Sequence, residues 1–178
     1  MTVFISGGAK CGKSVIAQEL AVKLAAGEKL FYVATMIPTG AEDEDRIRLH
    51  LLDRAGMGFE TVECFRDITS IVDKDGTFLV DNITSLMQNA MFPPEIGYQM
   101  DLDGARRCCE ELVSFAGSVR NAVFVSDHIY SDAETYSGTT ESYRRCLSEA
   151  DRTLAKHCDV VMEVTAGYPI IYKGEKIL

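Results

Sequence analysis

The stretch that decides the fold reads Val3-Phe4-Ile5-Ser6-Gly7-Gly8-Ala9-Lys10-Cys11-Gly12-Lys13-Ser14. Residues 2–6 are apolar and rich in β-formers, and apolar side chains recur at helical spacing over residues 13–26. Between these runs, residues 7–14 fit the pattern G-x-x-x-x-G-K-[ST]. Glycines let successive backbone N–H groups turn inward around phosphate oxygens, and the N-terminus of the next helix adds partial positive charge. The stretch therefore predicts a strand, a phosphate-binding loop and a helix, in that order.

Two side chains of this loop are expected to act directly on a nucleotide. Lys13 would reach the outer phosphates, and the Ser14 hydroxyl would ligate Mg²⁺. The carboxylate that completes such a metal site is expected at the end of a neighbouring buried strand, where Asp81 follows Phe78-Leu79-Val80. The alternative is that Asp81 caps a helix over residues 84–91. The phosphate loop favours the metal role.

The remaining apolar runs predict an α/β fold. Continuous apolar strands are expected at residues 30–35, 77–83 and 121–126, with helices at residues 13–26, 42–55, 84–91, 102–119 and 139–157. Residues 159–165 and 168–173 are expected to form a C-terminal hairpin that turns at Ala166-Gly167. Apolar strands that alternate with helices indicate a mostly parallel sheet with helices on both faces, of the RecA-like P-loop NTPase type. Ligands of such sheets bind at the carboxyl ends of the strands.

Length, charge and hydropathy exclude several classes of protein. The 178 residues suit one domain, so residues 1–178 are expected to form a single nucleotide-binding and transferase domain. The 18 Lys and Arg against 27 Asp and Glu give a net charge of −9, which disfavours nucleic acid and anionic lipid as partners. No apolar run approaches the ~18 residues that a membrane helix needs, and the N-terminus lacks the features of a signal peptide, so a cytoplasmic location is expected. The six cysteines lack metal-ligand spacing and are expected to be free thiols packed as small hydrophobes.

A second informative segment runs from Arg46 to Arg54. In a helix, Arg46, His50 and Arg54 share one face because they are four residues apart. Ile47 and Leu51, with Ala55, fall on an adjacent face that is expected to dock on the core.

This arrangement places an imidazole between two cations. Neighbouring cations keep the ring neutral, and neutral imidazole is a competent nucleophile towards phosphorus. The alternative is a solvated helix face on which acids and bases pair with each other. The pattern alone does not separate His50 from His128 or His157, and His157 is placed to cap the C-terminus of a helix.

Several further segments share a family resemblance with the phosphate loop. They are Phe31-Tyr32-Val33-Ala34-Thr35, Arg46-Ile47-x-x-His50, Thr61-x-Glu63, Leu79-Val80-Asp81-x-Ile83-Thr84, Asn89 and Ala166-Gly167-Tyr168-Pro169-x-x-x-Lys173. Together with residues 3–14 they resemble the bifunctional adenosylcobinamide kinase / adenosylcobinamide-phosphate guanylyltransferase family. The phosphate loop alone is generic, whereas its coupling to Arg-Ile-x-x-His is specific to that family.

The resemblance implies an enzyme of cobalamin biosynthesis. It would phosphorylate the aminopropanol hydroxyl of adenosylcobinamide with ATP or GTP, and would then transfer GMP from GTP onto that phosphate with release of pyrophosphate. In the family a histidine carries GMP covalently, and the matching residue is His50, with Lys13 as the other catalytic residue. The implied nucleotide contacts are Gly7–Ser14, Ala34, Thr35, Met36, Arg46, Leu51, Leu52, Asp53, Arg54, Glu63 and Asp81, the implied Mg²⁺ ligands are Ser14 and Asp81, and the implied assembly is a homotrimer.

The chain departs from the family pattern mainly in its second half. The family's Asn-Glu-Val-Gly is here Asp127-His128-Ile129-Tyr130, and its Phe-Arg-Asp…Gly…Asn-Gln is here Tyr143-Arg144-Arg145…Ser148…Asp151-Arg152. These are polar or loop-forming positions, which packing alone does not constrain. Two alternatives therefore stay open: a kinase or nucleotidyltransferase of the same fold with a different small-molecule acceptor, and a non-catalytic nucleotide-binding module.

Overall fold

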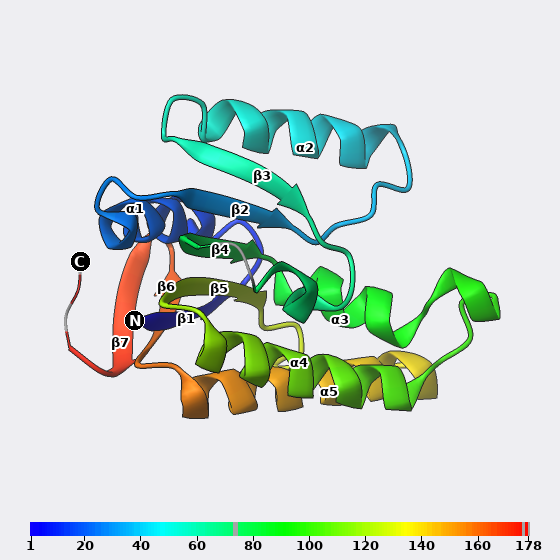
Figure 1. The fold of residues 1–178 in the computed structure, drawn as a ribbon. Coiled ribbons are helices and arrows are strands. Elements are labelled where there is room, and N and C mark those ends of the chain that lie inside the picture. The colour runs from blue at the N-terminus through cyan, green and yellow to red at the C-terminus, as the bar shows by residue number, and fades with distance from the viewer. Residues whose placement is uncertain (73–74, 176, 178) are drawn as a thin grey trace.

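The computed structural model describes residues 1–72, 75–175 and 177, and leaves the side chains of Glu42, Glu44 and Arg46 undescribed (Figure 1). The strands are β1 (Thr2–Gly7), β2 (Leu30–Ala34), β3 (Phe59–Glu63), β4 (Thr77–Asp81), β5 (Asn121–Asp127), β6 (Val160–Thr165) and β7 (Tyr168–Lys173). The α-helices are α1 (Lys13–Ala25), α2 (Ala41–Asp53), α3 (Ile83–Met91), α4 (Leu102–Ser118) and α5 (Gly138–His157), with 3₁₀ turns at Ile68–Ile71 and Pro94–Ile96. No helix in these described ranges is long and apolar enough to cross a membrane.

The strands form one sheet in the order β3-β2-β4-β5-β1-β6-β7, parallel throughout except for β7. The predicted mostly parallel sheet and the C-terminal hairpin are therefore confirmed. Asp81 was expected on the strand next to the phosphate loop, and this is wrong, because β5 lies between β1 and β4. The strand beside β1 ends instead in Asp127, in register with Gly7.

The sheet buries a core on each face. On one face Phe4, Phe78 and Phe124 pack with α3, α4 and α5. On the other face Leu79 and Val125 pack under α1. Successive strand residues point to opposite faces, so the two strand ends that matter for the site, at residues 81 and 127, point towards the α1 face.

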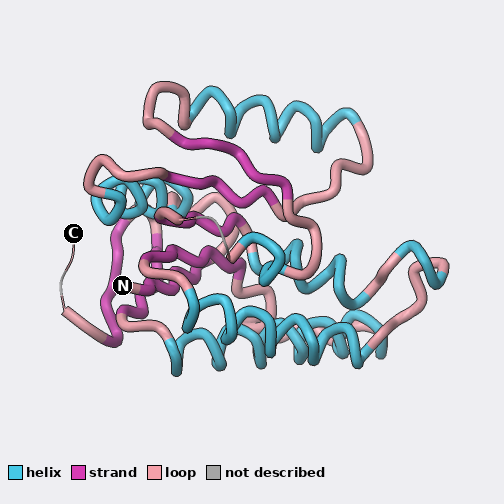
Figure 2. The backbone as a smooth tube through the Cα atoms, viewed as in Figure 1, coloured by secondary structure: helices cyan, strands magenta, loops and turns pink. Residues whose placement is uncertain are grey.

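Two local predictions about secondary structure failed. The strand β3 was not expected, because it lies at the sheet edge and its side chains are half-buried or exposed, which leaves a weak hydrophobic pattern. The prediction that α2 docks on the core is also wrong, since Leu51 is 46% exposed and Ala55 is exposed. Figures 1 and 2 show the reason: α2 stands beyond the sheet edge beside β3, carried on a loop at each end.

The cysteines are free thiols, and Cys64, Cys108 and Cys158 lie within the core as predicted. Burial raises the pKa of each of these three thiols. They therefore behave as small apolar side chains.

A carboxyl group is buried between α5 and β5. Asp151 is 3% exposed, and the Tyr130 hydroxyl donates a hydrogen bond to its Oδ2 at 2.8 Å. Burial raises the pKa of Asp151 to about 7, and the charge of Asp127 pushes it in the same direction. Ionisation of Asp151 near neutral pH therefore lowers the stability of the folded protein.

The substitution Asp151→Asn tests this cost. Because the pKa of Asp151 is raised on folding, the unfolded chain releases this proton first as the pH rises, and the contribution of Asp151 to the free energy of unfolding falls from about pH 4 to about pH 7. Relative to the wild type, Asp151→Asn should therefore gain roughly 2–3 kcal/mol in free energy of unfolding between about pH 5 and pH 8. Urea unfolding at the two pH values measures this difference, with the exposed Asp103→Asn as control. Parallel pH dependence in wild type and Asp151→Asn would contradict it.

Candidate functional site

The phosphate loop joins β1 to α1, as the sequence predicted. Gly12 precedes the first turn of α1 with φ 94°, in the left-handed region that favours glycine. The loop leans on the turn between β6 and β7, where the Gly167 N–H donates to the Cys11 carbonyl at 2.8 Å. A Cβ on Gly12 would lie 3.3 Å from the Gly167 Cα, and a Cβ on Gly7 would lie 2.6 Å from the Val164 carbonyl oxygen. Glycine is therefore required at both positions.

Lys13 is held in place by two contacts. Its Nζ donates to the Gly8 carbonyl at 2.9 Å and lies 2.5 Å from Asp127 Oδ1. The Asn82 side-chain amide donates to Asp127 Oδ2 at 2.9 Å, while Asn82 Oδ1 accepts the Ser85 N–H as the N-cap of α3. Since Asn82 caps α3, the alternative capping role for Asp81 is wrong.

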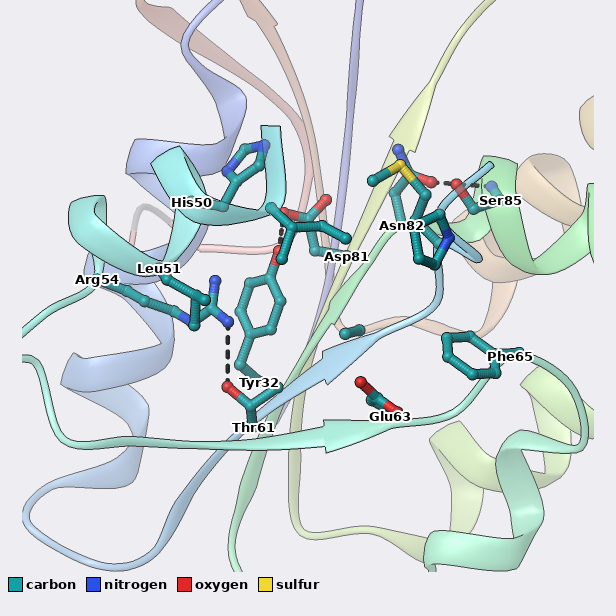
Figure 3. Close-up of a pocket in the computed structure, with 14 residues that line it drawn as sticks. Tyr32, His50, Leu51, Arg54, Thr61, Glu63, Phe65, Asp81, Asn82 and Ser85 are labelled. Atoms are coloured by element: carbon teal, nitrogen blue, oxygen red, sulfur yellow. Dashed lines mark hydrogen bonds between the residues drawn. The ribbon is translucent and has the colours of Figure 1, made fainter. Parts of the chain in front are cut away.

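A cavity of about 180 Å³ opens beside this network (Figure 3). Its lining joins α2 to the carboxyl ends of β2, β3 and β4. The residues are Tyr32, Ala34, Met36, Pro38, Ile47, His50, Leu51, Arg54, Thr61, Glu63, Phe65, Asp81, Asn82 and Ser85. The predicted catalytic residue His50 is among them, with six of the predicted nucleotide contacts: Ala34, Met36, Leu51, Arg54, Glu63 and Asp81.

Asp81 is the electrostatic centre of the cavity. Burial raises its pKa, while the Tyr32 hydroxyl, which donates to Asp81 Oδ2 at 2.9 Å, lowers it. His50 and Lys13 each act on the same carboxyl group and lower its pKa, and Asp127 raises it. The fold places His50 on α2 and Asp81 at the end of β4 on one cavity. Asn82, which lines the same cavity, connects it through Asp127 to Lys13 on α1.

The wall formed by α2 is both apolar and cationic. The Arg54 guanidinium lies over the Tyr32 ring at 3.8 Å from its centroid and donates to the Thr61 hydroxyl at 3.0 Å. Arg54 is buried by this stacking, which is a favourable arrangement for a cation on an aromatic face. Ile47 and Leu51 line the same cavity. The apolar face that was expected to meet the core therefore faces the cavity.

The other predicted site residues have different fates. Thr35 is fully buried. Its hydroxyl donates to the Asn82 carbonyl at 2.7 Å and accepts the Asn82 N–H at 2.8 Å, so Thr35 fixes the backbone of a residue that lines the cavity. Leu52 and Asp53 are exposed and do not line the cavity. The predicted contact of Arg46 falls on a side chain outside the described residues.

The other two histidines lie elsewhere. His157 Nδ1 lies 2.8 Å from the Thr153 carbonyl in the last turn of α5, as expected for a residue at a helix C-terminus. His128 follows β5 and lies 3.8 Å from Glu163. Of the three, only His50 lines the cavity.

Tyr32, Asn82 and Asp127 make hydrogen bonds or an ion pair within the site, and sequence reasoning assigned none of the three to it. Asp127 had a usable signal, because it ends a continuous apolar strand just as Asp81 does. Tyr32 was hidden within an apolar run, and nothing local to Asn82 indicates that it reaches across to Asp127.

A second cavity of about 440 Å³ lies on the far side of Asn82 and Ser85, between the loop after β2 and α3. Apolar side chains and uncharged polar groups form most of its lining. The residues are Met36, Ile37, Thr39, Asp43, Asn82, Thr84, Ser85, Gln88, Asn89, Phe92, Pro94, Tyr98 and Asp127. Asp127 connects this cavity to Lys13 and hence to the phosphate loop.

The residues present fit a cation that binds together with phosphates. Among the described residues, no group of three or more His, Cys, Asp or Glu could hold a metal ion. Magnesium commonly takes only one or two protein oxygens and completes its shell with water and substrate phosphates. A buried carboxylate whose pKa is raised, as in Asp81, is the kind of group that a cation would stabilise.

Comparison with known proteins supports the fold and identifies a family. Residues 3–171 match the family model described as cobinamide kinase / cobinamide phosphate guanyltransferase. No curated protein matches the chain. A protein from Pyrococcus horikoshii OT3 is 12% identical with a TM-score of 0.52, over 99% of this chain and 87% of that one. An ATPase of the type III secretion system of pathogenic bacteria is 13% identical with a TM-score of 0.52, over 92% of this chain and 51% of that one. These structures are similar in fold, which agrees with the predicted α/β class.

The left-handed conformation at Gly12 gives a direct test of the loop. Gly12→Ala should cost about 1–2 kcal/mol in free energy of unfolding, since alanine is strained at positive φ, and should weaken binding of a nucleoside triphosphate at least ~10-fold. Urea unfolding and calorimetric titration measure the two effects.

Gly117→Ala is the matched control, because Gly117 is an exposed helical residue of α4 with open space around its Cα. It should leave binding unchanged and stabilise the protein by up to about 1 kcal/mol. Equal effects of the two substitutions on binding would contradict the assignment of the loop.

Proposed function

The chain belongs to the cobinamide kinase / cobinamide phosphate guanyltransferase family of cobalamin biosynthesis, and on that premise we propose that it transfers GMP through a covalent intermediate on His50. In full, it phosphorylates adenosylcobinamide and then moves GMP from GTP onto the new phosphate. One observation carries the proposal: His50 lines the same cavity as Asn82, and the Asn82 amide binds the Asp127 carboxylate that pairs with Lys13 of the phosphate loop.

The loading step requires an imidazole nitrogen free to attack phosphorus. We assign the attack to Nε2, because His50 Nδ1 is buried and has no hydrogen-bond partner among the described residues. Nε2 attacks the α-phosphorus of GTP, a P–N bond forms, and the bond from the α-phosphorus to the bridging oxygen breaks to release pyrophosphate. Lys13 and the loop N–H groups stabilise the charge that develops on the leaving phosphates.

The transfer step reverses the same chemistry. A phosphate oxygen of adenosylcobinamide phosphate attacks the α-phosphorus, the P–N bond breaks, and the imidazole is free again. Splitting one displacement between two anions into two in-line displacements lowers the repulsion that each must overcome.

The kinase step uses the phosphate loop with the acceptor in the second cavity. That cavity offers amide and hydroxyl groups and apolar surface, which suit an acceptor with amide side chains, and it meets the phosphate loop at Asp127. The acceptor hydroxyl attacks the terminal phosphorus of the triphosphate and gives up its proton to solvent. The bond from that phosphorus to the bridging oxygen breaks, and the nucleoside diphosphate leaves.

The proposal also includes Mg²⁺ and a homotrimer. Ser14 and Asp81 would hold the metal, which would neutralise phosphate charge. An apolar edge supports assembly: Tyr168, Ile170 and Tyr172 are 78%, 49% and 66% exposed on β7, the last strand of the sheet.

Incubation with GTP labelled in the α-phosphate should attach one GMP per chain. The bond should be acid-labile and base-stable, as expected for phosphorus on nitrogen. His50→Ala should reduce the label at least ~100-fold, because the nucleophile is gone, while GTP affinity changes by less than about threefold. Autoradiography and calorimetric titration measure the two quantities.

His157→Ala is the matched control, because the His157 ring lies against a backbone carbonyl of α5. This variant should still attach GMP to His50 as the wild type does. A label that persists in His50→Ala would refute the assignment. Addition of adenosylcobinamide phosphate should then discharge the wild-type label, and a loaded protein that resists discharge would indicate a different acceptor.

A further inference from the structure

We propose that Asp127 makes this site selective for metal-bound triphosphate, because its carboxylate engages the charge of Lys13 unless a divalent cation arrives with the nucleotide. The inference rests on the proposed function only in placing a nucleoside triphosphate at the phosphate loop.

The position of the Asp127 carboxylate is fixed from both sides. Oδ1 lies 2.5 Å from Lys13 Nζ, and Oδ2 accepts the Asn82 amide at 2.9 Å. The backbone is also tied: the Asp127 N–H donates to the Thr84 hydroxyl at 3.0 Å, and the His128 N–H donates to the Gly7 carbonyl at 3.2 Å. Asp127 therefore cannot swing away from the phosphate loop without breaking several hydrogen bonds.

The carboxylate opposes the ligand that Lys13 would bind. Lys13 is the loop residue that would bind the outer phosphates. In this structure its charge is paired with Asp127. A metal-free triphosphate carries several negative charges to within a few ångströms of the same carboxylate. At that separation inside a protein the repulsion weakens binding by on the order of 10–100-fold.

A divalent cation removes the conflict. It neutralises part of the phosphate charge and is attracted by the same carboxylate, so the repulsive contact becomes neutral or favourable. Asp81 ends β4, the strand paired with β5, and Ser14 lies in α1, which packs against β5, so both could hold such a cation.

The carboxylate at position 127 distinguishes this chain from the family pattern that it resembles. Asp127 stands where the resembling family pattern has Asn, so the substitution Asp127→Asn exchanges the charge and keeps the shape. The Asn82 amide can still donate to the oxygen at this position, which preserves the hydrogen bond that orients it.

The experiment is calorimetric titration with a GTP analogue whose α–β bridge is methylene, so that GMP cannot load onto His50. Wild type and Asp127→Asn are compared in excess Mg²⁺ and in EDTA. Asp127→Asn should tighten binding at least ~10-fold in EDTA and change it by less than about threefold in Mg²⁺. The control Asp103→Asn removes the same charge at an exposed residue of α4 and should leave both affinities unchanged.

Two results would overturn the inference: unchanged affinity of Asp127→Asn in EDTA, or equal tightening with and without Mg²⁺. If urea unfolding shows that Asp127→Asn is not folded, Asp127→Ser serves in its place, with the same expected result. Wild-type protein that binds the analogue under neither condition would instead refute the proposed function. The two failures are therefore distinguishable.

Discussion

The site depends on the parallel pairing of β1, β5 and β4. Parallel strands end at the same edge of a sheet, so the phosphate loop, Asp127 and Asp81 reach that edge side by side. The pairing places Gly7 opposite Asp127 and Asp81 opposite Val125. The contact between Lys13 and Asp127 follows from this register, because Lys13 comes directly after the phosphate loop and meets a carboxylate whose position the sheet sets.

The regular elements could be predicted because their patterns are strong and local. The buried strands β1, β2, β4 and β5 are continuous apolar runs. The phosphate-loop motif at residues 7–14 predicts the helix that follows it. The strand β3 could not be predicted from such a pattern, because an edge strand buries too little of its surface. Strand order could not be read either, and this is why Asp127 was overlooked in favour of Asp81.

The sequence predicted which residues belong to the candidate site better than it predicted how they are arranged. Lys13, Asp81 and His50 were named from motifs, yet no local pattern states that α2 leaves the core and covers a cavity. Helical spacing correctly placed an apolar stripe beside His50, but the stripe has two possible destinations with the same sequence signature. Only the position of α2 beyond β3 decides that Ile47 and Leu51 face a cavity. The Arg54 stack on Tyr32 is likewise a contact between elements that sequence spacing cannot reveal.

The hairpin at the C-terminal end supports the phosphate loop through main-chain atoms at Val164 and Gly167. Gly167 offers an N–H to Cys11 and leaves just enough room for Gly12, and the Val164 carbonyl leaves none for a side chain at Gly7. The phosphate loop therefore depends on the path of the hairpin's backbone and not on the side chains on its outer surface. A substitution of Tyr168, whose side chain is 78% exposed, would therefore leave the backbone that supports the phosphate loop in place.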